Sequence, residues 1–247
     1  MSNSFSLDAG APHAATVVAR TQESPTIFTL KLRLDDAAAQ AAYRFAPGQF
    51  NMLYLYGVGE VPISIMSDPE EREGIGHTIR ALGRVTRGLA ALKPGDRVGL
   101  RGPFGRGWPL QEVSGCDIVL VTGGLGCAPV VSVIHYVLRR RERFGKLVII
   151  QGVKHAEDLI WREQYDRWAK LPDTQVLVAA SEGAAFWPWH VGRVTELFGL
   201  ANFDPGCAVA MMCGPEGMMR TAADSLLQRG LPESRLYLSM ERNMQCA

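Results

Sequence analysis

The stretch that most constrains this chain is residues 117–129, which read DIVLVTGGLGCAP. A short aliphatic run is followed at once by Gly123, Gly124 and Gly126, and an apolar segment with helical spacing begins at Pro129. This order predicts a strand, a tight turn and the start of a helix. Glycines let a backbone approach a phosphate closely, and the first turn of a helix offers free N–H groups and a positive dipole end. The turn therefore indicates a dinucleotide site.

Taken alone, Gly-Gly-x-Gly is weakly specific, because it lacks the full spacing of the standard dinucleotide fingerprint and also suits a plain tight turn. The surrounding pattern gives it weight. From about residue 117, strands alternate with helices, which is typical of a parallel sheet covered on both faces. We expect strands at 117–122, 147–153, 175–180, 208–213 and 236–240, and helices at 129–144, 157–170, 194–198 and 215–229.

The preceding part of the chain has a different rhythm, with short β-type runs separated by turn signals. These runs lie at 26–34, 49–56, 62–66, 77–82 and 97–101, with one short helix at 86–92. The expected fold is an antiparallel six-stranded β-barrel followed by a parallel, doubly wound α/β domain. The expected boundaries are a loose leader at 1–15, the barrel at 16–112, the α/β domain at 113–240 and a tail at 241–247.

Composition narrows the classes of function. The 247 residues are 47% apolar, enough for two domains, and the net charge of +1 gives no reason to expect a nucleic-acid partner. No apolar run reaches the ~20 residues of a membrane span and the N-terminus does not resemble an export signal, so we expect a cytoplasmic protein. The five cysteines include no C-x-x-C pair, and the scattered histidines suggest no catalytic group.

Four motifs in the first domain occur in an order and spacing that resemble the ferredoxin reductase family. They are FAPGQF at 45–50, VPIS at 61–64, GRVT at 83–86 and GPFG at 102–105. Proteins of that family have a flavin-binding barrel before a nicotinamide-binding domain, and the resemblance extends over essentially the whole chain. It implies that FAD and NAD(P)H are the cofactors.

The resemblance also implies roles for individual residues. Ser64 would contact the flavin near its reactive N5 edge as a catalytic group, although an ordinary strand hydroxyl is the alternative. Val61 and Ile63 depart from the family, which commonly has Arg and an aromatic residue there, so the flavin ring would lie against aliphatic carbon. The expected FAD-binding residues, with Arg80 or Arg84 facing the pyrophosphate, are Pro62, Ile63, Ser64, Arg80, Gly83, Arg84, Val85 and Thr86.

In the second domain, Cys213, Gly214 and Pro215 follow the fourth expected strand and match a C-G-P motif that borders the nicotinamide in the family. Cys213 is the second expected catalytic residue, with a small buried hydrophobe as the alternative for its side chain. Glu182, after the third strand, would accept hydrogen bonds from the adenosine ribose and favours NAD. Basic residues after the second strand, Lys154 and Arg162, leave NADP open. The tryptophans at 187 and 189 suit a packed loop corner, an adenine cap or a partner surface.

The stretch 47–69 is similar to one branch of the family, the flavin (gamma) subunits of soluble NiFe hydrogenases, or sulfhydrogenases, and the related flavin subunit of anaerobic sulfite reductase. More distantly it resembles the electron-transfer subunit of dihydroorotate dehydrogenase. In the first two, a tail like residues 239–247 leads into the cysteines of a 2Fe-2S cluster, whose first ligand matches Cys246. A cluster needs four thiolates, and the other four cysteines lie in or beside expected strands and turns, so the residues present do not supply it. We expect a truncated tail; loss of the cluster, or a simple tail cysteine, are the alternatives.

The resemblance predicts an electron-transfer (diaphorase) subunit. It would exchange electrons between NAD(P)H, FAD and the iron–sulfur centres of partner subunits, first of a cytoplasmic hydrogenase and second of sulfite reductase. Two alternatives remain: a free-standing NAD(P)H–flavin reductase, and a non-catalytic nucleotide-sensing module whose barrel holds no flavin.

Overall fold

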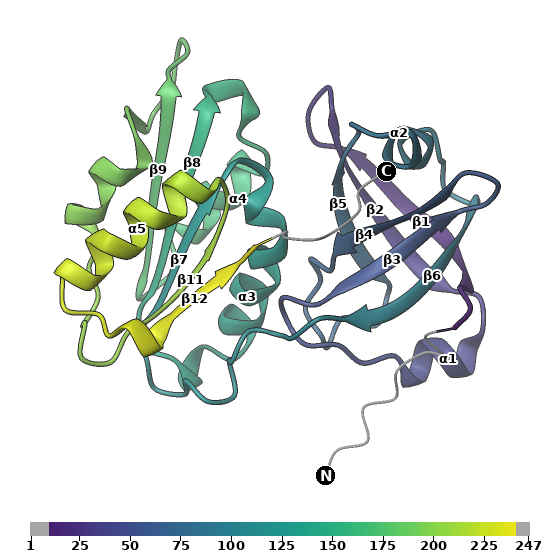
Figure 1. Ribbon diagram of the computed structural model, residues 1–247, viewed down its shortest axis with the longest axis horizontal. Coiled ribbons are helices and arrows are strands. Elements are labelled where there is room, and N and C mark those ends of the chain that lie inside the picture. The colour runs from purple at the N-terminus through teal and green to yellow at the C-terminus, as the bar shows by residue number, and fades with distance from the viewer. Residues whose placement is uncertain (1–9, 241–247) are drawn as a thin grey trace. The chain divides into compact units, whose positions relative to one another are not determined.

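The first half of the chain forms an antiparallel sheet in the computed structural model, which describes residues 10–240. The strands follow the order β4-β3-β6-β1-β2-β5, so β4 and β5 are the two edges of this sheet (Figure 1). Their bounds are β1 (His13–Gln22), β2 (Ile27–Leu34), β3 (Phe50–Leu55), β4 (Gly59–Ser64), β5 (Ile75–Arg80) and β6 (Arg97–Phe104). The six-stranded barrel is confirmed.

Period-two alternation in these strands builds the barrel core. In β2, every second side chain is buried, and Phe28, Leu30 and Leu32 are at most 1% exposed. The residues between them face outward, as expected for strands with one face on a core. Two short helices accompany the strands, α1 (Ala37–Ala42) and α2 (Arg84–Ala90). The carboxylate of Asp36 caps α1 by accepting a hydrogen bond from Ala39 N.

Two elements of this sheet region were not predicted from the sequence. Strand β1 begins at His13, inside the segment expected to be a loose leader, and pairs with both β2 and β6. Its small and polar residues give a weak strand signal, so pairing with two neighbours determines its structure. Helix α1 was also not predicted, because its six alanine and glutamine residues show no helical spacing of large apolar side chains. Helix α2 begins two residues before the expected start at residue 86.

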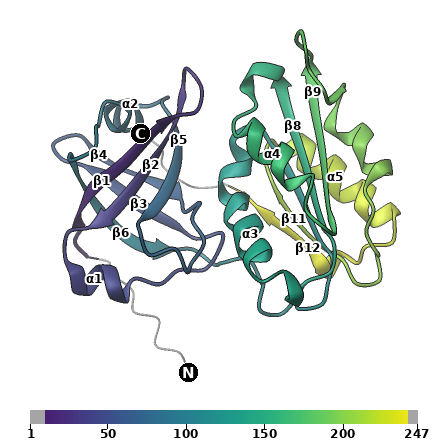
Figure 2. The same ribbon diagram turned by 180° about the vertical axis from the view of Figure 1, so that it is seen from behind.

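The second half forms a parallel sheet in the order β10-β9-β8-β7-β11-β12. The chain runs from β7 through β8 to β9 on one side and continues at β11 on the other, so the strand order reverses between β7 and β11. Helix α5 lies in front of the sheet in Figure 1 and α4 in Figure 2, so both faces are covered. The bounds are β7 (Ile118–Gly123), α3 (Ala128–Arg139), β8 (Leu147–His155), α4 (Arg162–Trp168), β9 (Thr174–Glu182), β10 (His190–Val191), β11 (Val209–Cys213), α5 (Glu216–Gln228) and β12 (Leu236–Ser239).

The parallel α/β architecture is confirmed, with local differences. The helix expected at 157–170 is only α4, because Trp161 has the left-handed φ of 57° and separates α4 from a short turn at Ala156–Asp158. The two-residue strand β10 was not predicted. No helix within residues 10–240 has both the length and the apolar character that crossing a bilayer requires.

Candidate functional site

Two loops meet where the strand order of the parallel sheet reverses. Strands β7 and β11 are hydrogen-bonded neighbours, and Cys213 pairs with Thr122. Both strands therefore end at the same edge, with the Gly123 turn beside the segment that begins at Gly214. The reversal point at the carboxyl edge is where open α/β sheets bind ligands. The structure thus brings the two glycine motifs together.

The two loops approach so closely that only glycine fits. A Cβ on Gly126 would lie 2.3 Å from the carbonyl oxygen of Cys213, and one on Gly214 would lie 2.9 Å from the amide nitrogen of Gly123. The three nearest atoms at Gly126 are all backbone, and at Gly214 the side chain of Met218 lies in the way as well as the Gly123 backbone, so a side-chain shift alone cannot relieve either contact. The motif at 123–126 and the motif at 213–215 therefore form one interlocked surface of main chain.

Gly124 is the open point of this surface. Its φ of +54° is in the left-handed region, and a Cβ there would have no atom within 4 Å. A 3-10 turn, Gly124–Cys127, leads into α3, which has Pro129 in its first turn. The N–H groups of a first helical turn lack acceptors within the helix and favour an anion. This turn has the space, the backbone donors and the dipole that a dinucleotide pyrophosphate requires.

Two buried polar side chains, those of Gln151 and Thr122, hold the turn at Gly124 in place. Gln151 on β8 is 1% exposed, and its amide Nε2 donates to the carbonyl oxygens of Gly124 and Gly152, both at 3.1 Å. Thr122 donates its hydroxyl hydrogen to Oε1 of Gln151. Neither residue was singled out from the sequence. The available signal was one amide within an otherwise aliphatic strand, LVIIQGV.

The cysteines at this edge are buried. Cys213 is 7% exposed and Cys127 is 4% exposed. Cys127 is hydrogen-bonded to the hydroxyl of Tyr165, and burial together with this thiol holds the pKa of Tyr165 well above its ordinary value. The backbone of Cys213 lies in the interlocked surface, and its side chain is buried. Its expected catalytic role remains a proposal.

The expected adenosine side of the site is at the end of β9. Glu182 is paired with His155, with 3.1 Å between Oε2 and Nδ1, because the two residues are register partners in β9 and β8. Arg162 lies over the rings of both tryptophans, 5.1 Å from Trp187 and 5.4 Å from Trp189. The tryptophans are in edge contact at 5.0 Å, so this loop corner is packed around one guanidinium group.

In the barrel, the end of edge strand β4 presents Ser64. Val61 is 6% exposed and Ile63 packs partly against the barrel core, so these two side chains face inward. Because side chains alternate along a strand, Pro62 and Ser64 occupy the opposite face, and both are half-buried. The face available to a flavin at this strand therefore carries Pro62 and Ser64, with Ile63 behind them.

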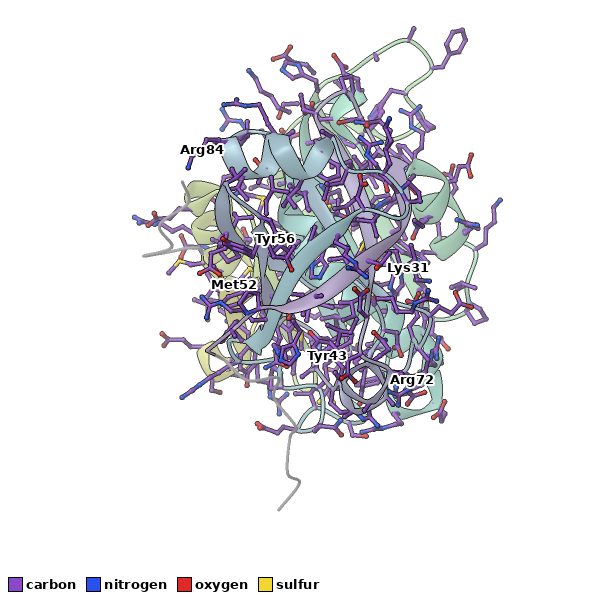
Figure 3. The ribbon with its side chains drawn as sticks, turned by 90° about the vertical axis from the view of Figure 1, so that its right-hand side faces the viewer. Lys31, Tyr43, Met52, Tyr56, Arg72 and Arg84 are labelled. Atoms are coloured by element: carbon purple, nitrogen blue, oxygen red, sulfur yellow. The ribbon has the colours of Figure 1, made fainter. Side chains whose placement is uncertain are left out.

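In the segment around the start of α2, some groups are already hydrogen-bonded within the protein and others could bind a phosphate. The Thr86 hydroxyl accepts hydrogen bonds from the amides of Leu82 (3.0 Å) and Gly83 (2.9 Å) and therefore caps the helix. Val85 is 2% exposed and belongs to the barrel core. Arg84, labelled at the end of this helix in Figure 3, donates to the carbonyl oxygen of Val58 at 2.8 Å. The first-turn amides and the Arg84 charge are the groups left for a phosphate.

Arg80 supplies an observation that fits an anionic ligand. It is the last residue of β5, two residues before the segment that caps α2, and its Nε is buried without a hydrogen-bond partner among the described residues. A buried donor without an acceptor is costly unless a ligand provides one. The site residues of the barrel therefore fit a cofactor that carries negatively charged oxygens.

The first and last barrel motifs are joined to each other. Gln49 accepts from the amide of Ala46 at 2.8 Å and donates to the carbonyl oxygen of Gly105 at 2.9 Å. The rings of Phe50 and Phe104 are 5.8 Å apart. The FAPGQF and GPFG motifs are therefore in direct contact with each other.

Cys246, the expected first ligand of an iron–sulfur cluster, lies outside the described residues. Among residues 10–240, no group of three or more histidine, cysteine or acidic side chains is placed to hold a metal ion.

Comparison with known proteins finds a family model within the second half of the chain and relatives over most of its length. Residues 120–224 match the family model of the oxidoreductase NAD-binding domain. The chain is 33% identical over 216 residues to the sulfhydrogenase 1 gamma subunit of Pyrococcus furiosus, covering 87% of this chain and 74% of that protein. It is 30% identical to a probable dihydroorotate dehydrogenase B electron-transfer subunit of Methanocella arvoryzae, covering 95% of this chain and 81% of that protein.

Among solved structures, a ferredoxin NADP+ reductase from Neisseria gonorrhoeae with bound FAD and NADP is similar, with a TM-score of 0.76 at 20% identity. The match covers 92% of this chain and 97% of that one. At this identity, the likeness concerns the fold.

Proposed function

The chain belongs to the ferredoxin reductase-like family of FAD- and NAD(P)-binding proteins, and from this premise we propose that it is a flavin-dependent electron-transfer subunit. It would pass electrons from NAD(P)H to iron–sulfur centres of partner subunits, or in the reverse direction. The observation that carries the proposal is the interlocked main chain at Gly123, Gly126 and Gly214, which leaves Gly124 open at the strand reversal.

The residues of each part have distinct tasks in this proposal. The Gly124 turn would bind the pyrophosphate of NAD(P)H, the Cys213–Pro215 segment would border its nicotinamide, and Glu182 would bind its ribose. Arg80, Arg84 and the first turn of α2 would hold FAD by its pyrophosphate, and Ser64 would orient the flavin ring. When bound, the cofactors supply the redox chemistry, in which a hydride leaves the nicotinamide and its two electrons leave the flavin singly. The chain needs no side-chain acid or base for this reaction.

We propose a hydrogenase as the partner complex. The support is the 33% identity to sulfhydrogenase gamma subunits over 87% and 89% of the chain. Dihydroorotate dehydrogenase is the second candidate, because its electron-transfer subunits are similar over up to 95% of the chain. The neighbouring genes discriminate between them, since subunits of one complex are commonly encoded together.

The flavin part is tested by gentle purification and addition of FAD. We expect a yellow protein that binds FAD in a one-to-one ratio and reduces a one-electron dye with NADH or NADPH. The ratio of the two rates gives the coenzyme preference. A colourless protein that takes up no FAD would contradict the proposal and support the nucleotide-sensing alternative.

The Ser64 assignment has its own variant pair. Ser64→Ala should change the visible flavin spectrum and slow flavin reduction by NAD(P)H, whereas Ser64→Thr keeps a hydroxyl at this position and should preserve both. An unchanged spectrum and rate in Ser64→Ala would remove Ser64 from the site.

The subunit part is tested on the native protein. We expect it to copurify with iron–sulfur subunits and to reduce its physiological acceptor only within that complex. A monomer that reduces a physiological acceptor at full rate would instead be a free-standing flavin reductase.

A further inference from the structure

A chain of hydrogen bonds crosses the interior of the barrel and ends on the main chain of Ser64. His77, on β5, is fully buried, and its ring Nδ1 lies 3.0 Å from the carbonyl oxygen of Ser64. The other ring nitrogen, Nε2, lies 3.3 Å from the amide Nδ2 of Asn51, which is also fully buried. The hydroxyl of Tyr43 donates to Asn51 Oδ1 at 2.7 Å. Tyr43 is labelled in Figure 3, near the α1 end of the barrel.

The chemistry of these partners fixes the direction of every bond. A carbonyl oxygen only accepts, so Nδ1 of His77 carries the ring hydrogen. Burial lowers the pKa of His77 to about 4, so at neutral pH its Nε2 is a bare acceptor for the Asn51 amide. The amide oxygen of Asn51 then faces the Tyr43 hydroxyl, as observed. All the bonds point the same way, from Tyr43 to the Ser64 carbonyl.

This chain of hydrogen bonds joins the two edge strands of the sheet. Strands β4 and β5 are the two edges of the strand order and share no ladder of backbone hydrogen bonds. Backbone and side-chain bonds link β5 to the segment after β4, from Met66 N to Gly76 O at 2.9 Å and from Gly76 N to Ser67 Oγ at 2.7 Å. His77 reaches β4 itself, at its last residue. The peptide between Ser64 and Ile65 is therefore held on both sides: its N–H donates to Gln49 O at 2.9 Å, and its carbonyl oxygen accepts from the His77 side chain of the opposite edge.

Gly102 gives independent evidence that the fold makes room for this chain. A Cβ on Gly102 would lie 2.3 Å from Oδ1 of Asn51, and its φ of +141° also favours glycine. Gly102 belongs to the GPFG motif at 102–105. This glycine leaves space for the Asn51 amide in the orientation that the hydrogen bonds require.

We propose that Tyr43, Asn51 and His77 are positioning residues that set the place of Ser64 against the flavin by holding its carbonyl group. The flavin part rests on the proposed function, whereas the hydrogen-bond chain exists without any cofactor. The Ser64 side chain and carbonyl belong to one residue at the end of an edge strand, so a rotated Ser64 peptide would move the hydroxyl as well.

Two amide substitutions of His77 test the hydrogen bonds of its two ring nitrogens separately. In His77→Asn, the shorter amide places an N–H where Nδ1 was and keeps the bond to Ser64. In His77→Gln, the longer amide reaches the Nε2 position and keeps the bond to Asn51, but it loses the bond to Ser64. Thr78→Val is the matched control, because it removes a buried hydroxyl of the same strand whose contacts are Thr29 and Met66.

The readouts are the dissociation constant for FAD and the visible flavin spectrum of the full chain. We expect His77→Gln to weaken FAD binding by about tenfold, the factor that corresponds to one buried hydrogen bond, and to shift the spectrum. His77→Asn and Thr78→Val should stay within about twofold of the parent, because the bond to Ser64 is kept in both. Equal losses in all three variants, or none in His77→Gln, would overturn the positioning role.

Nitrogen-15 NMR of the FAD-free protein tests the chain separately. We expect a neutral His77 ring at pH 7 with its hydrogen on Nδ1. A hydrogen on Nε2, or a charged ring at pH 7, would overturn the hydrogen-bond chain. A parent protein that binds no FAD would overturn the proposed function and the flavin part of this inference, while the NMR result still decides the chain.

Discussion

The α/β sheet and the barrel prepare their sites by different means. In the α/β sheet, the site is a surface of main chain, in which Gly126 and Gly214 remove every side chain that would separate two loops. In the barrel, the proposed site residue Ser64 is half-buried at a strand end, and its carbonyl is held by a chain of buried polar side chains. The first kind of site depends on the absence of side chains at glycines, and the second depends on hydrogen bonds between buried polar groups.

This difference decides how each site should fail. A new Cβ in the main-chain surface collides with backbone, which cannot move locally, so the loops must separate. A missing partner in the barrel leaves a buried polar group unsatisfied while the packing survives.

Gly126→Ala tests the main-chain surface most severely. We expect it to lower the free energy of unfolding by about 3 kcal/mol and to abolish NAD(P)H binding, because its Cβ would meet the Cys213 carbonyl. Urea unfolding and coenzyme titration measure both effects. Gly217→Ala is the matched control, since a Cβ there meets no atom within 4 Å. A Gly126→Ala protein that binds coenzyme normally would show that the loops are not interlocked.

Acid should weaken the barrel through His77. Its pKa is about 4 in the folded protein, against 6.5 for an ordinary histidine, so between these pH values the unfolded chain binds more protons. The stability that the neutral His77 contributes is therefore fully present above pH 6.5 and is lost as the pH falls through 4. We expect the free energy of unfolding to decrease by about 2 kcal/mol from pH 7 to pH 5. The His77→Asn variant, which cannot titrate here, should lose correspondingly less; an equal loss would assign the effect to other groups.

Tyr43→Phe removes one hydroxyl and leaves the Asn51 amide oxygen without that donor. We expect a loss of about 1.5 kcal/mol in the free energy of unfolding, with the barrel still folded. Tyr56→Phe should change stability by less than about 0.5 kcal/mol, because its side chain is half exposed. If thermal or urea unfolding gives the same free energy of unfolding for both variants, the hydrogen bond of Tyr43 to Asn51 contributes nothing to stability.

Gly124→Ala separates backbone strain from steric collision. Its φ of +54° should cost about 1 kcal/mol for alanine, although the added Cβ meets no protein atom. Gly115→Ala has the same open surroundings and a φ of +81°, away from the proposed site. We expect both to lose similar stability, but only Gly124→Ala to bind NAD(P)H more weakly. Equal coenzyme affinities would move the pyrophosphate away from the turn.

The two kinds of site also differ in how well the sequence predicts them. Gly123, Gly124 and Gly126 indicate a turn because glycine acts on its own backbone, and the parallel-sheet rule then places Cys213 beside them. The partners of Asn51 could not be predicted, because His77 is 26 residues away and reaches it only through the strand register. Gln151 was missed for the same reason, since its contact with Thr122 spans 29 residues.

Strand β1 shows a limit of a different kind. Its alternating pattern is weak, and two neighbouring strands supply its hydrogen bonds. Local residue preference therefore favoured a loose segment there, while pairing with β2 and β6 favours a strand.

The strand order has a consequence for the order of events during synthesis. All six barrel strands are complete by Phe104, whereas the coenzyme surface needs β11, which ends at Cys213. A nascent chain that has emerged from the ribosome as far as residue 200 therefore carries every strand of the barrel but only one of the two loops of the coenzyme surface. The proposed FAD site can therefore form first, and the proposed coenzyme surface can form only after Cys213 has emerged.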